Sequence, residues 1–317
     1  MPPTTHALAQ RIDQFRQLGR MQAGSLITSV FGDAVLPRGG RLWLGSLIAL
    51  LEPLGLNERL VRTAVYRLVK EGWLATEAHG RRTDYMLTPD GQSRFLEASR
   101  QIYAAETPPW DGQWRLLLVV APLDNRSREA LRRALFWQGF GEWGTGAFVH
   151  PSADLSSVFK ALRNDGMAPL LPALLPLLAS QPPLLPSGQP TDLVRNAWNL
   201  DELAQGYAVF VDTYRPVLQA LEATPAGALD PAQAFQLRTL LIHDFRRLLL
   251  RDPELPDELL AKRWPGQQAR ALSKALYGHL LAPSEAYLDR MVQLASRERP
   301  MVLPGVQARF GGTGAPA

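Results

Sequence analysis

The segment between residues 42 and 88 constrains the fold most strongly, because it places two helices and a hairpin in immediate succession. The apolar run Leu42–Leu51 predicts a helix, which the proline and glycine that follow it end. Asn57 is a favourable N-cap for the next helix, Glu58–Glu71. Two helices joined by a short glycine-containing turn are typical of a helix-turn-helix.

The residues around this pair extend it to a winged helix. An apolar segment at 25–32 predicts a preceding helix, which makes Glu58–Glu71 the third helix. Residues 72–78 and 83–88 read as two strands, and 79–82 as the tight turn between them. A β-hairpin directly after the third helix is the wing of a winged helix. A further helix is expected from Gln92 to Tyr103.

The third helix has one apolar and one polar face. Leu60, Val61, Ala64, Val65 and Leu68 fall on the apolar face at helical spacing. An ordinary amphipathic helix with a solvated charged face would show the same pattern. The polar face, however, is rich in cations, and the predicted wing tip carries two more. Between residues 38 and 82 eight basic residues face four acidic ones, a local net charge of +4 that equals that of the whole chain.

These cations suit DNA. Arginine forks read guanine edges in the major groove, while Lys, Thr and Tyr contact phosphates and position the helix. The pattern therefore predicts binding to double-stranded operator DNA. The residues expected to contact it are Arg38, Asn57, Arg59, Arg62, Thr63, Tyr66, Arg67, Lys70, Arg81 and Arg82.

Beyond residue 105 the sequence changes character. Buried-strand patterns at Trp114–Ala121 and Ala147–His150 alternate with predicted helices at Arg126–Gln138 and Leu155–Arg163, which indicates a small α/β domain. Residues 191–290 are predominantly helical in pattern, and the Gly/Pro-rich tail past Pro300 is expected to be frayed. The predicted class is thus α+β multidomain, with domains at 1–107, 108–190 and 191–317.

Composition excludes several classes of protein. With no cysteine, the chain has no disulfide, no cysteine-ligated zinc and no thiol nucleophile. The apolar stretch Met167–Leu185 is broken by prolines, so it reads as a loop or short packed turns and not as a membrane span. No signal peptide is evident, and we expect a cytoplasmic protein.

Motifs that resemble catalytic or cofactor sites are better explained structurally. Residues 139–144 fit G-x-G-x-x-G, but they follow a predicted helix and lead into a strand, the reverse of a dinucleotide fingerprint, so we expect a turn. The five histidines show no metal-ligand spacing, and Asp257 and Glu258 are expected to begin a helix. We predict no catalytic residues, no metal and no resident cofactor.

Several of these segments resemble the PaaX family, the phenylacetic-acid-degradation transcriptional repressors. The resemblance covers roughly residues 24–290. Its motifs are Leu26–Gly40, Trp43–Ile48, Asn57–Leu68, Gly80–Tyr85, Leu240–Arg247, Asp252–Pro256 and Trp264–Gly266. It implies an N-terminal winged helix-turn-helix, a central ferredoxin-like (Cas2-like) domain and a helical C-terminal domain.

The resemblance also implies a function. It implies a homodimer that represses phenylacetate catabolic genes and has phenylacetyl-coenzyme A as inducer. The family motif carries over onto Arg59, Arg62, Thr63, Arg67, Arg81 and Arg82 as candidate DNA contacts. The alternative is an acyl-thioester or nucleic-acid-processing enzyme that uses the winged helix for docking. That alternative finds little support, because the central strands offer no clustered carboxylates.

No family motif fixes the effector site, so its prediction rests on residue chemistry. An acyl-CoA combines an apolar head with a polyanionic handle and needs an apolar pocket beside cations, since arginine forks suit phosphate. Residues 203–251 supply such parts, although their spacing equally fits a buried stripe and a helix that ends in arginines. The predicted ligand-binding residues are Tyr207, Phe210, Tyr214, His243, Phe245, Arg246, Arg247 and Arg251.

Overall fold

The computed structural model divides the chain into two compact units. Unit 1 comprises Met1–Ala105, Tyr207–Leu248 and Pro265–Ala317, and unit 2 comprises Glu106–Gly206 and Leu249–Trp264. The residues that the structure describes are 3–17, 23–104, 106–107, 109–180, 190–225, 227–303 and 305–311. The C-terminal helices thus group with the N-terminal region. The division into three successive domains, which the sequence indicated, stays a prediction.

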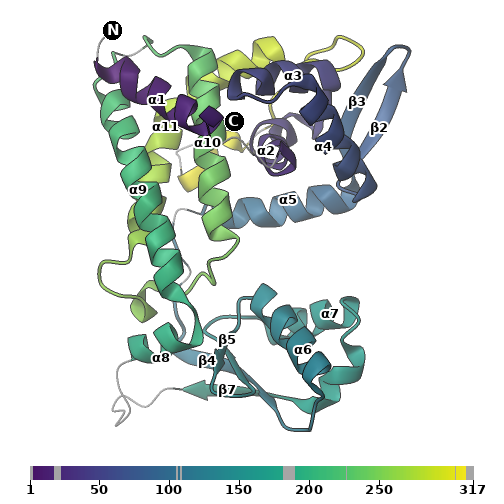
Figure 1. Ribbon diagram of the computed structural model, residues 1–317, viewed down its shortest axis with the longest axis vertical. Coiled ribbons are helices and arrows are strands. Elements are labelled where there is room, and N and C mark those ends of the chain that lie inside the picture. Colours follow the sequence, from purple (N-terminus) through teal and green to yellow (C-terminus); the bar gives the residue numbers. More distant parts are fainter. Residues whose placement is uncertain are drawn as a thin grey trace. The chain divides into compact units, whose positions relative to one another are not determined.

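Unit 1 is mainly helical and contains one small sheet (Figure 1). Its strands pair antiparallel in the order β1-β3-β2. Its elements are α1 (Pro3–Gln17), α2 (Ala23–Val30), η1 (Phe31–Val35), η2 (Leu36–Arg38), β1 (Arg41–Trp43), α3 (Leu44–Leu51), η3 (Glu52–Leu54), α4 (Glu58–Lys70), β2 (Leu74–His79), β3 (Arg82–Leu87), α5 (Pro89–Ile102), most of α9 (Leu200–Glu222), α10 (Pro231–Leu249), α11 (Pro265–Met291) and η6 (Val306–Gly311).

The order of helices and hairpin in unit 1 follows the prediction, with one addition. The predicted helix Leu42–Leu51 begins only at Leu44, because the residues before it form β1. This strand pairs with β3, Leu42 opposite Tyr85, and gives β3 a second neighbour. Helix α5 begins at Pro89, three residues earlier than predicted, with Thr88 as its N-cap.

The tail past Pro300 is not frayed throughout, so that prediction was wrong for η6. Phe310 is 2% exposed and packs against the rings of Tyr103 and Tyr277, at centroid distances of 5.4 and 5.3 Å. Burial of one aromatic side chain contributes about 1.5–3 kcal/mol, which offsets the entropy cost of ordering the Gly/Pro-rich residues around it. Residues 312–317 of the predicted tail lie outside the described part of the chain.

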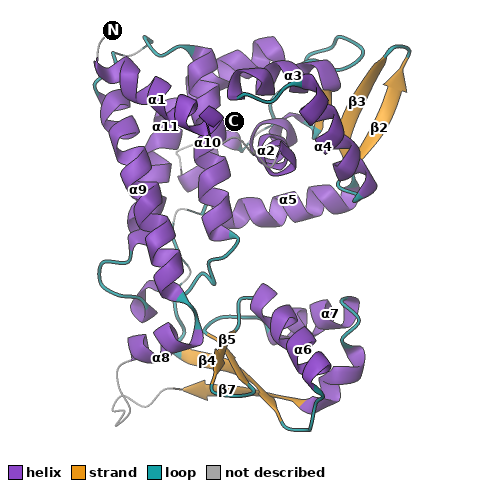
Figure 2. Cartoon of the chain, in the orientation of Figure 1, coloured by secondary structure: helices purple, strands orange, loops and turns teal. Residues whose placement is uncertain are grey.

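Unit 2 contains a four-stranded antiparallel sheet in the order β5-β6-β4-β7. Helices α6 and α7 lie together on one side of it (Figure 2), where Leu131 and Leu162 pack with Leu117 and Phe148 of the strands. Its elements are β4 (Gln113–Val119), α6 (Asn125–Trp137), β5 (Gly141–Trp143), β6 (Ala147–His150), α7 (Leu155–Asn164), η4 (Ala168–Ala173), β7 (Leu174–Ser180), α8 (Pro190–Ala197) and η5 (Asp257–Leu259).

Two predicted loops in unit 2 contain strands. The glycine motif at 139–144 includes β5, which pairs with β6 and extends the sheet. The stretch Met167–Leu185 forms a 3-10 segment and then β7, which pairs with β4 along its whole length. Pro176 is tolerated because β7 is an edge strand, where a missing N–H need not interrupt the ladder. Residues 181–189 of that stretch lie outside the described residues.

Within the described ranges, no helix is both long enough and apolar enough to cross a membrane.

Candidate nucleic-acid interface

Helix α4 is fixed at its start and along one face. Asn57 Oδ1 accepts a hydrogen bond of 2.9 Å from the Leu60 N–H, as expected of an N-cap. The turn before it is held by Arg16, which donates to the Pro53 carbonyl at 2.9 Å. Val61 and Val65 are buried where α4 packs against α2 and α3. The opposite face of α4 therefore points to solvent.

The exposed face of α4 is the polar face predicted from the sequence. The exposed residues are Arg59, Arg62, Thr63, Tyr66, Arg67 and Lys70. Leu60 is exposed as well, at 44%, although its spacing assigned it to the apolar face. Tyr66, the aromatic residue of this helix, is 72% exposed, so its ring and hydroxyl are available to a partner.

The arginines of this face are held only loosely by the protein. Arg62 pairs with Glu58 at 2.7 Å and Arg67 with Glu71 at 3.3 Å, both one helical turn apart and both exposed. Exposed pairs of this kind contribute about 0–1 kcal/mol, so a phosphate or base can replace the carboxylate at small cost. Among the described residues, Arg59 and Lys70 have no ion-pair partner.

The hairpin of β2 and β3 lies beside α4 (Figure 1). Its tip turns at Gly80, whose φ of +60° lies in the left-handed region. Arg81 next to it is exposed. The guanidinium of Arg82 stacks over the Trp43 ring, 4.3 Å from its centroid, so Arg82 is half-buried and its orientation is fixed. Arg81 is the freer of the two predicted wing contacts.

A charged cluster that the sequence analysis did not single out stiffens the base of this hairpin. Arg41 Nε donates to the buried Asp84 carboxylate at 2.7 Å and pairs with Glu77 at 2.8 Å. Arg41 Nη2 also lies 2.8 Å from His79 Nε2. Partial burial lowers the pKa of Arg41, but the hydrogen bonds to Asp84 and Glu77 outweigh it and raise that pKa. The hairpin is therefore anchored to β1.

Arg38 is buried and does not belong to the exposed face of α4, which contradicts its prediction as a DNA contact. Arg38 is 2% exposed, and its guanidinium pairs with Glu285 at 2.6 Å and with Asp289 at 2.7 Å. Both carboxylates come from α11, about 250 residues later in the sequence. The local sequence around Arg38 gives no sign of this pairing, which depends entirely on tertiary packing.

Asp33 is the centre of a larger buried cluster that includes groups from α5, α10, α11 and η6. Arg238 Nε lies 2.7 Å and Arg309 Nη1 2.8 Å from its carboxylate, and Tyr103 and Tyr277 donate to it at 2.6 and 3.0 Å. Burial raises the pKa of Asp33, but the two guanidinium groups outweigh burial and lower it. The turn after α2 is thereby fixed to the C-terminal part of unit 1.

The aromatic residues predicted for the effector site lie in the core of unit 1. Tyr207, Phe210, Tyr214 and Phe245 are each at most 4% exposed. The rings of Phe210 and Tyr214 are 4.7 Å apart and those of Phe210 and Phe245 5.7 Å apart. The Tyr214 hydroxyl donates to Asp244 at 2.8 Å. The structure assigns these side chains a packing role, and their contact with a ligand stays a prediction.

The predicted cations of the effector site are separated. His243 is buried beside Ser29, and burial lowers its pKa to about 4, so it is neutral at physiological pH. Arg246 donates to the Ser25 carbonyl at 3.1 Å. Arg247 and Arg251 are exposed, and Arg251 lies 3.6 Å from Glu202. His243 and Arg246 therefore connect α10 to α2, while only the last two cations remain available.

In the part of the chain that the structure describes, no three His, Asp or Glu side chains gather as a metal site would require.

Three family profiles match consecutive parts of the chain. Residues 22–91 match "PaaX-like protein", residues 107–173 match "PaaX protein central Cas2-like domain", and residues 198–290 match "PaaX-like protein C-terminal domain". A curated protein, transcriptional repressor PaaX of Escherichia coli (strain K12), is 39% identical over 291 residues, which cover 91% of this chain and 90% of that protein. A solved structure, uncharacterized protein Rv0674 from Mycobacterium tuberculosis, is 27% identical, covers 75% of this chain and 90% of its own, and has a TM-score of 0.46.

Proposed function

Since the chain belongs to the PaaX family, we propose that it is a DNA-binding transcriptional repressor that reads its operator with helix α4. The observation that carries the proposal is the exposed cationic face of α4, beside a hairpin with Arg81 at its tip. The similar protein from Escherichia coli is named a repressor, which supports regulation over catalysis.

In this proposal the helices and sheet of residues 23–102 act as a winged helix. Helix α4 enters the major groove, where Arg62 and Arg67 exchange their weak intrahelical pairs for base edges. Arg59, Thr63, Tyr66 and Lys70 lie on the same face and contact phosphates. Arg81 contacts the flanking backbone and carries no sequence information.

We propose further that the protein acts as a homodimer through the sheet of unit 2. Leu116 pairs opposite Leu177 and Leu118 opposite Leu175, so these four side chains share the sheet face that α6 and α7 do not cover. Leu175 and Leu177 are 43% and 40% exposed. An exposed apolar sheet face is a typical association surface, and a second copy offers the same face across a two-fold axis.

The effector in this proposal is an aryl-acyl-CoA such as phenylacetyl-CoA, as the family resemblance implies. In this proposal the effector binds more tightly to a conformation that does not fit the operator than to the operator-bound conformation. A hundredfold loss of operator affinity requires that the binding free energies of the effector for these two conformations differ by only about 2.7 kcal/mol. Of the predicted residues, Arg247 and Arg251 offer exposed cations for the phosphates. The proposal includes a cytoplasmic location.

The DNA-binding proposal is tested by titrating operator and scrambled duplexes. We expect Arg62→Ala and Arg67→Ala to weaken operator binding by about 1–3 kcal/mol each and to affect scrambled DNA less. Arg81→Ala is expected to weaken both duplexes alike and to reduce the salt dependence. Lys274→Ala, which removes an exposed cation of α11, is the control. Unchanged affinity in all three arginine variants would refute the proposal.

The effector proposal needs a separate experiment. Calorimetry with phenylacetyl-CoA, CoA and phenylacetate, together with fluorescence anisotropy of labelled operator, compares the three compounds directly. We expect release by the thioester alone, because the free acid lacks the phosphate handle. Release by phenylacetate, or by none of the three, would contradict this part of the proposal and leave DNA binding untouched.

A further inference from the structure

The segment after α11, residues 292–303, returns to the small sheet of unit 1 and is fixed there. The Trp43 N–H donates to the Gln293 carbonyl at 2.9 Å, and the Gln293 N–H donates to Ser46 Oγ at 3.1 Å. The Ala295 N–H donates to Asp84 Oδ1 at 2.6 Å. These bonds attach the segment to β1, α3 and β3. It is therefore part of the same rigid body as the hairpin.

Asp84 is the common anchor. One of its oxygens accepts from Ala295, and the other accepts from Arg41, which also pairs with Glu77 of β2. The Asp84 residue is fully buried. A displacement of the hairpin relative to the segment would break bonds to a buried carboxylate, which is costly. The hairpin and the segment consequently keep a fixed relative position.

The segment makes a tight turn that projects two arginines. The Leu294 N–H donates to the Glu298 carbonyl at 2.8 Å, and the Arg297 N–H donates to the Leu294 carbonyl at 2.9 Å. Arg297 has a φ of +74°, a conformation that is uncommon for a residue other than glycine. The surrounding hydrogen bonds maintain this conformation, which orients the side chains on either side of Glu298.

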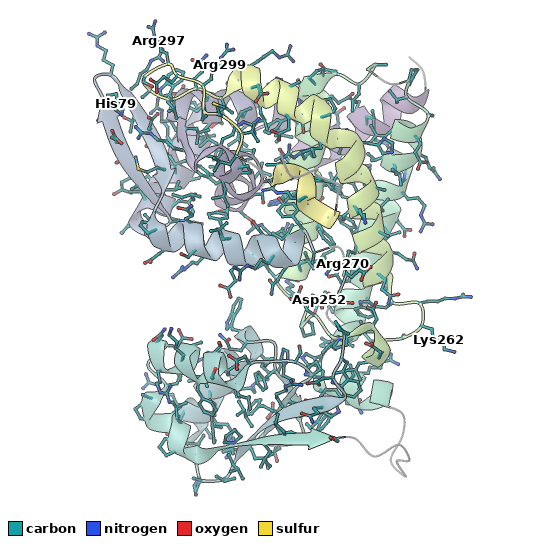
Figure 3. All side chains as sticks on the ribbon, turned by 180° about the vertical axis from the view of Figure 1, so that it is seen from behind. His79, Asp252, Lys262, Arg270, Arg297 and Arg299 are labelled. Atoms are coloured by element: carbon teal, nitrogen blue, oxygen red, sulfur yellow. The ribbon has the colours of Figure 1, made fainter. Side chains whose placement is uncertain are left out.

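Both arginines are exposed and unneutralised. Figure 3 shows Arg297 and Arg299 at the same end of unit 1 as His79, which lies near the tip of the hairpin. Neither has an ion-pair partner among the residues that the structure describes. Glu298 lies between them, so the turn carries a net charge of +1, and its carboxylate is 3.3 Å from Ser296 Oγ.

We propose that Arg297 and Arg299 form a second contact with the phosphate backbone of duplex DNA, beside the contact made by the wing. The proposal rests on the DNA-binding function proposed above. Two free cations beside the wing can contact the same DNA backbone that the wing approaches. Each phosphate that they neutralise releases condensed counterions, which favours binding. A loop that contacts only the backbone adds affinity and positions the reading helix without adding sequence preference.

The test compares the full-length double variants Arg297→Ala/Arg299→Ala and Arg297→Glu/Arg299→Glu with a matched control. The control, Arg215→Ala/Lys274→Ala, also removes two exposed cations of unit 1, neither of which has an ion-pair partner among the described residues. For the alanine variant we expect about tenfold weaker binding to operator and scrambled duplex alike, and a plot of log K against log salt that is shallower by about two. The glutamate variant should weaken binding further, and the control should leave both quantities near wild type.

The outcomes separate this inference from the proposed function, because Arg62→Ala is titrated in the same experiment. If Arg62→Ala weakens operator binding while the two double variants bind like wild type, the second contact is refuted and α4 remains the reading helix. If neither changes binding, the DNA-binding proposal fails. An equal loss in the control would also overturn the inference, since it would show only a general charge effect. Thermal melts should be unchanged, because both side chains are exposed.

Discussion

Two groups of arginines in unit 1 lie in opposite environments. On α4 and the hairpin, the guanidinium groups of Arg59 and Arg81 are exposed and have no ion-pair partner in the described structure. In the interior, Arg238 and Arg38 are 0% and 2% exposed. Arg238 pairs with Asp33 and Glu285, and Arg38 pairs with the same Glu285 and with Asp289. The chain uses one residue type both for a cationic surface and for a buried framework.

The difference shows what decides the role of an arginine. Arg38 and Arg59 lie close together in sequence, both near apolar helices, and charge counting treats them alike. Arg38 is buried because α11 brings Glu285 and Asp289 to it. Arg59 meets no such carboxylate, so its charge remains available to a partner. A guanidinium stays available to a partner where the fold does not bury it against a carboxylate.

The most severe way to break the buried framework is to remove its C-terminal half. We expect the fragment Met1–Ala105, expressed alone, not to fold stably. Asp33 and Arg38 would lose their ion pairs with Arg238, Glu285 and Arg309, and Tyr103 would lose its packing against the rings of Tyr277 and Phe310. Circular dichroism and two-dimensional NMR of the fragment would check this. A dispersed spectrum and tight binding to a single half-site would show instead that the winged helix is self-sufficient.

A single substitution tests the same framework. Asp33→Ala should lower the free energy of unfolding by about 3–5 kcal/mol, because it leaves the Arg238 and Arg309 charges buried without their carboxylate. Urea denaturation of wild type, Asp33→Ala and the exposed control Asp212→Ala would measure it. A loss no larger than in the control would mean that water or neighbouring groups compensate for the missing carboxylate.

The pH dependence of stability gives a third test. The pKa of His243 is lowered by burial from 6.5 to about 4. As the pH falls, the unfolded state therefore binds this proton at a higher pH than the folded state does. The stability that neutral His243 contributes is therefore complete above about pH 6.5 and is lost as the pH falls toward 4. Urea midpoints between pH 7 and 4 should fall more steeply in wild type than in His243→Gln. Parallel curves would contradict the assignment of this loss to His243.

The smallest expected effect is on the exposed group. Arg59→Ala should change the free energy of unfolding by no more than about 0.5 kcal/mol, since surface substitutions away from caps and networks seldom do more. Its affinity for DNA should nevertheless fall. Denaturation and duplex titration of the same preparation would show whether stability and binding separate. Loss of stability together with DNA affinity would show that Arg59 supports the fold, as the buried arginines do, and would contradict the distinction between the two groups.

The sequence predicted the elements that depend on local signals. Asn57 caps α4, Gly80 turns the hairpin, and the polar face of α4 is the one that solvent reaches. These features follow from capping, turn geometry and helical periodicity within a few residues. The exposed candidate DNA contacts other than Arg38 were therefore predictable as a surface, while their contact with DNA stays a prediction.

The remainder depends on partners far along the chain. Strand β1 has three residues and exists because β3, more than forty residues later, pairs with it. Arg38 is buried because α11 supplies its carboxylate partners. Phe310 is buried against Tyr103, which follows α5, and against rings of α10 and α11. The turn with Arg297 and Arg299 lies beside the small sheet of unit 1 because Ala295 donates to Asp84 of β3. No local pattern encodes such pairings.

The buried contact between Asp33 and Arg309 also has a consequence for folding during synthesis, because it can form only when the end of the chain has been made. The two residues are 276 positions apart. At about 5–20 residues per second, the ribosome takes roughly 14–55 s to produce the second after the first. For most of that interval α4 has already been made, but the Asp33 carboxylate lacks both guanidinium partners, because Arg238 itself follows Asp33 by 205 residues. A nascent or prematurely terminated chain would thus carry α4 without the buried ion pairs that join the turn after α2 to the C-terminal part of unit 1.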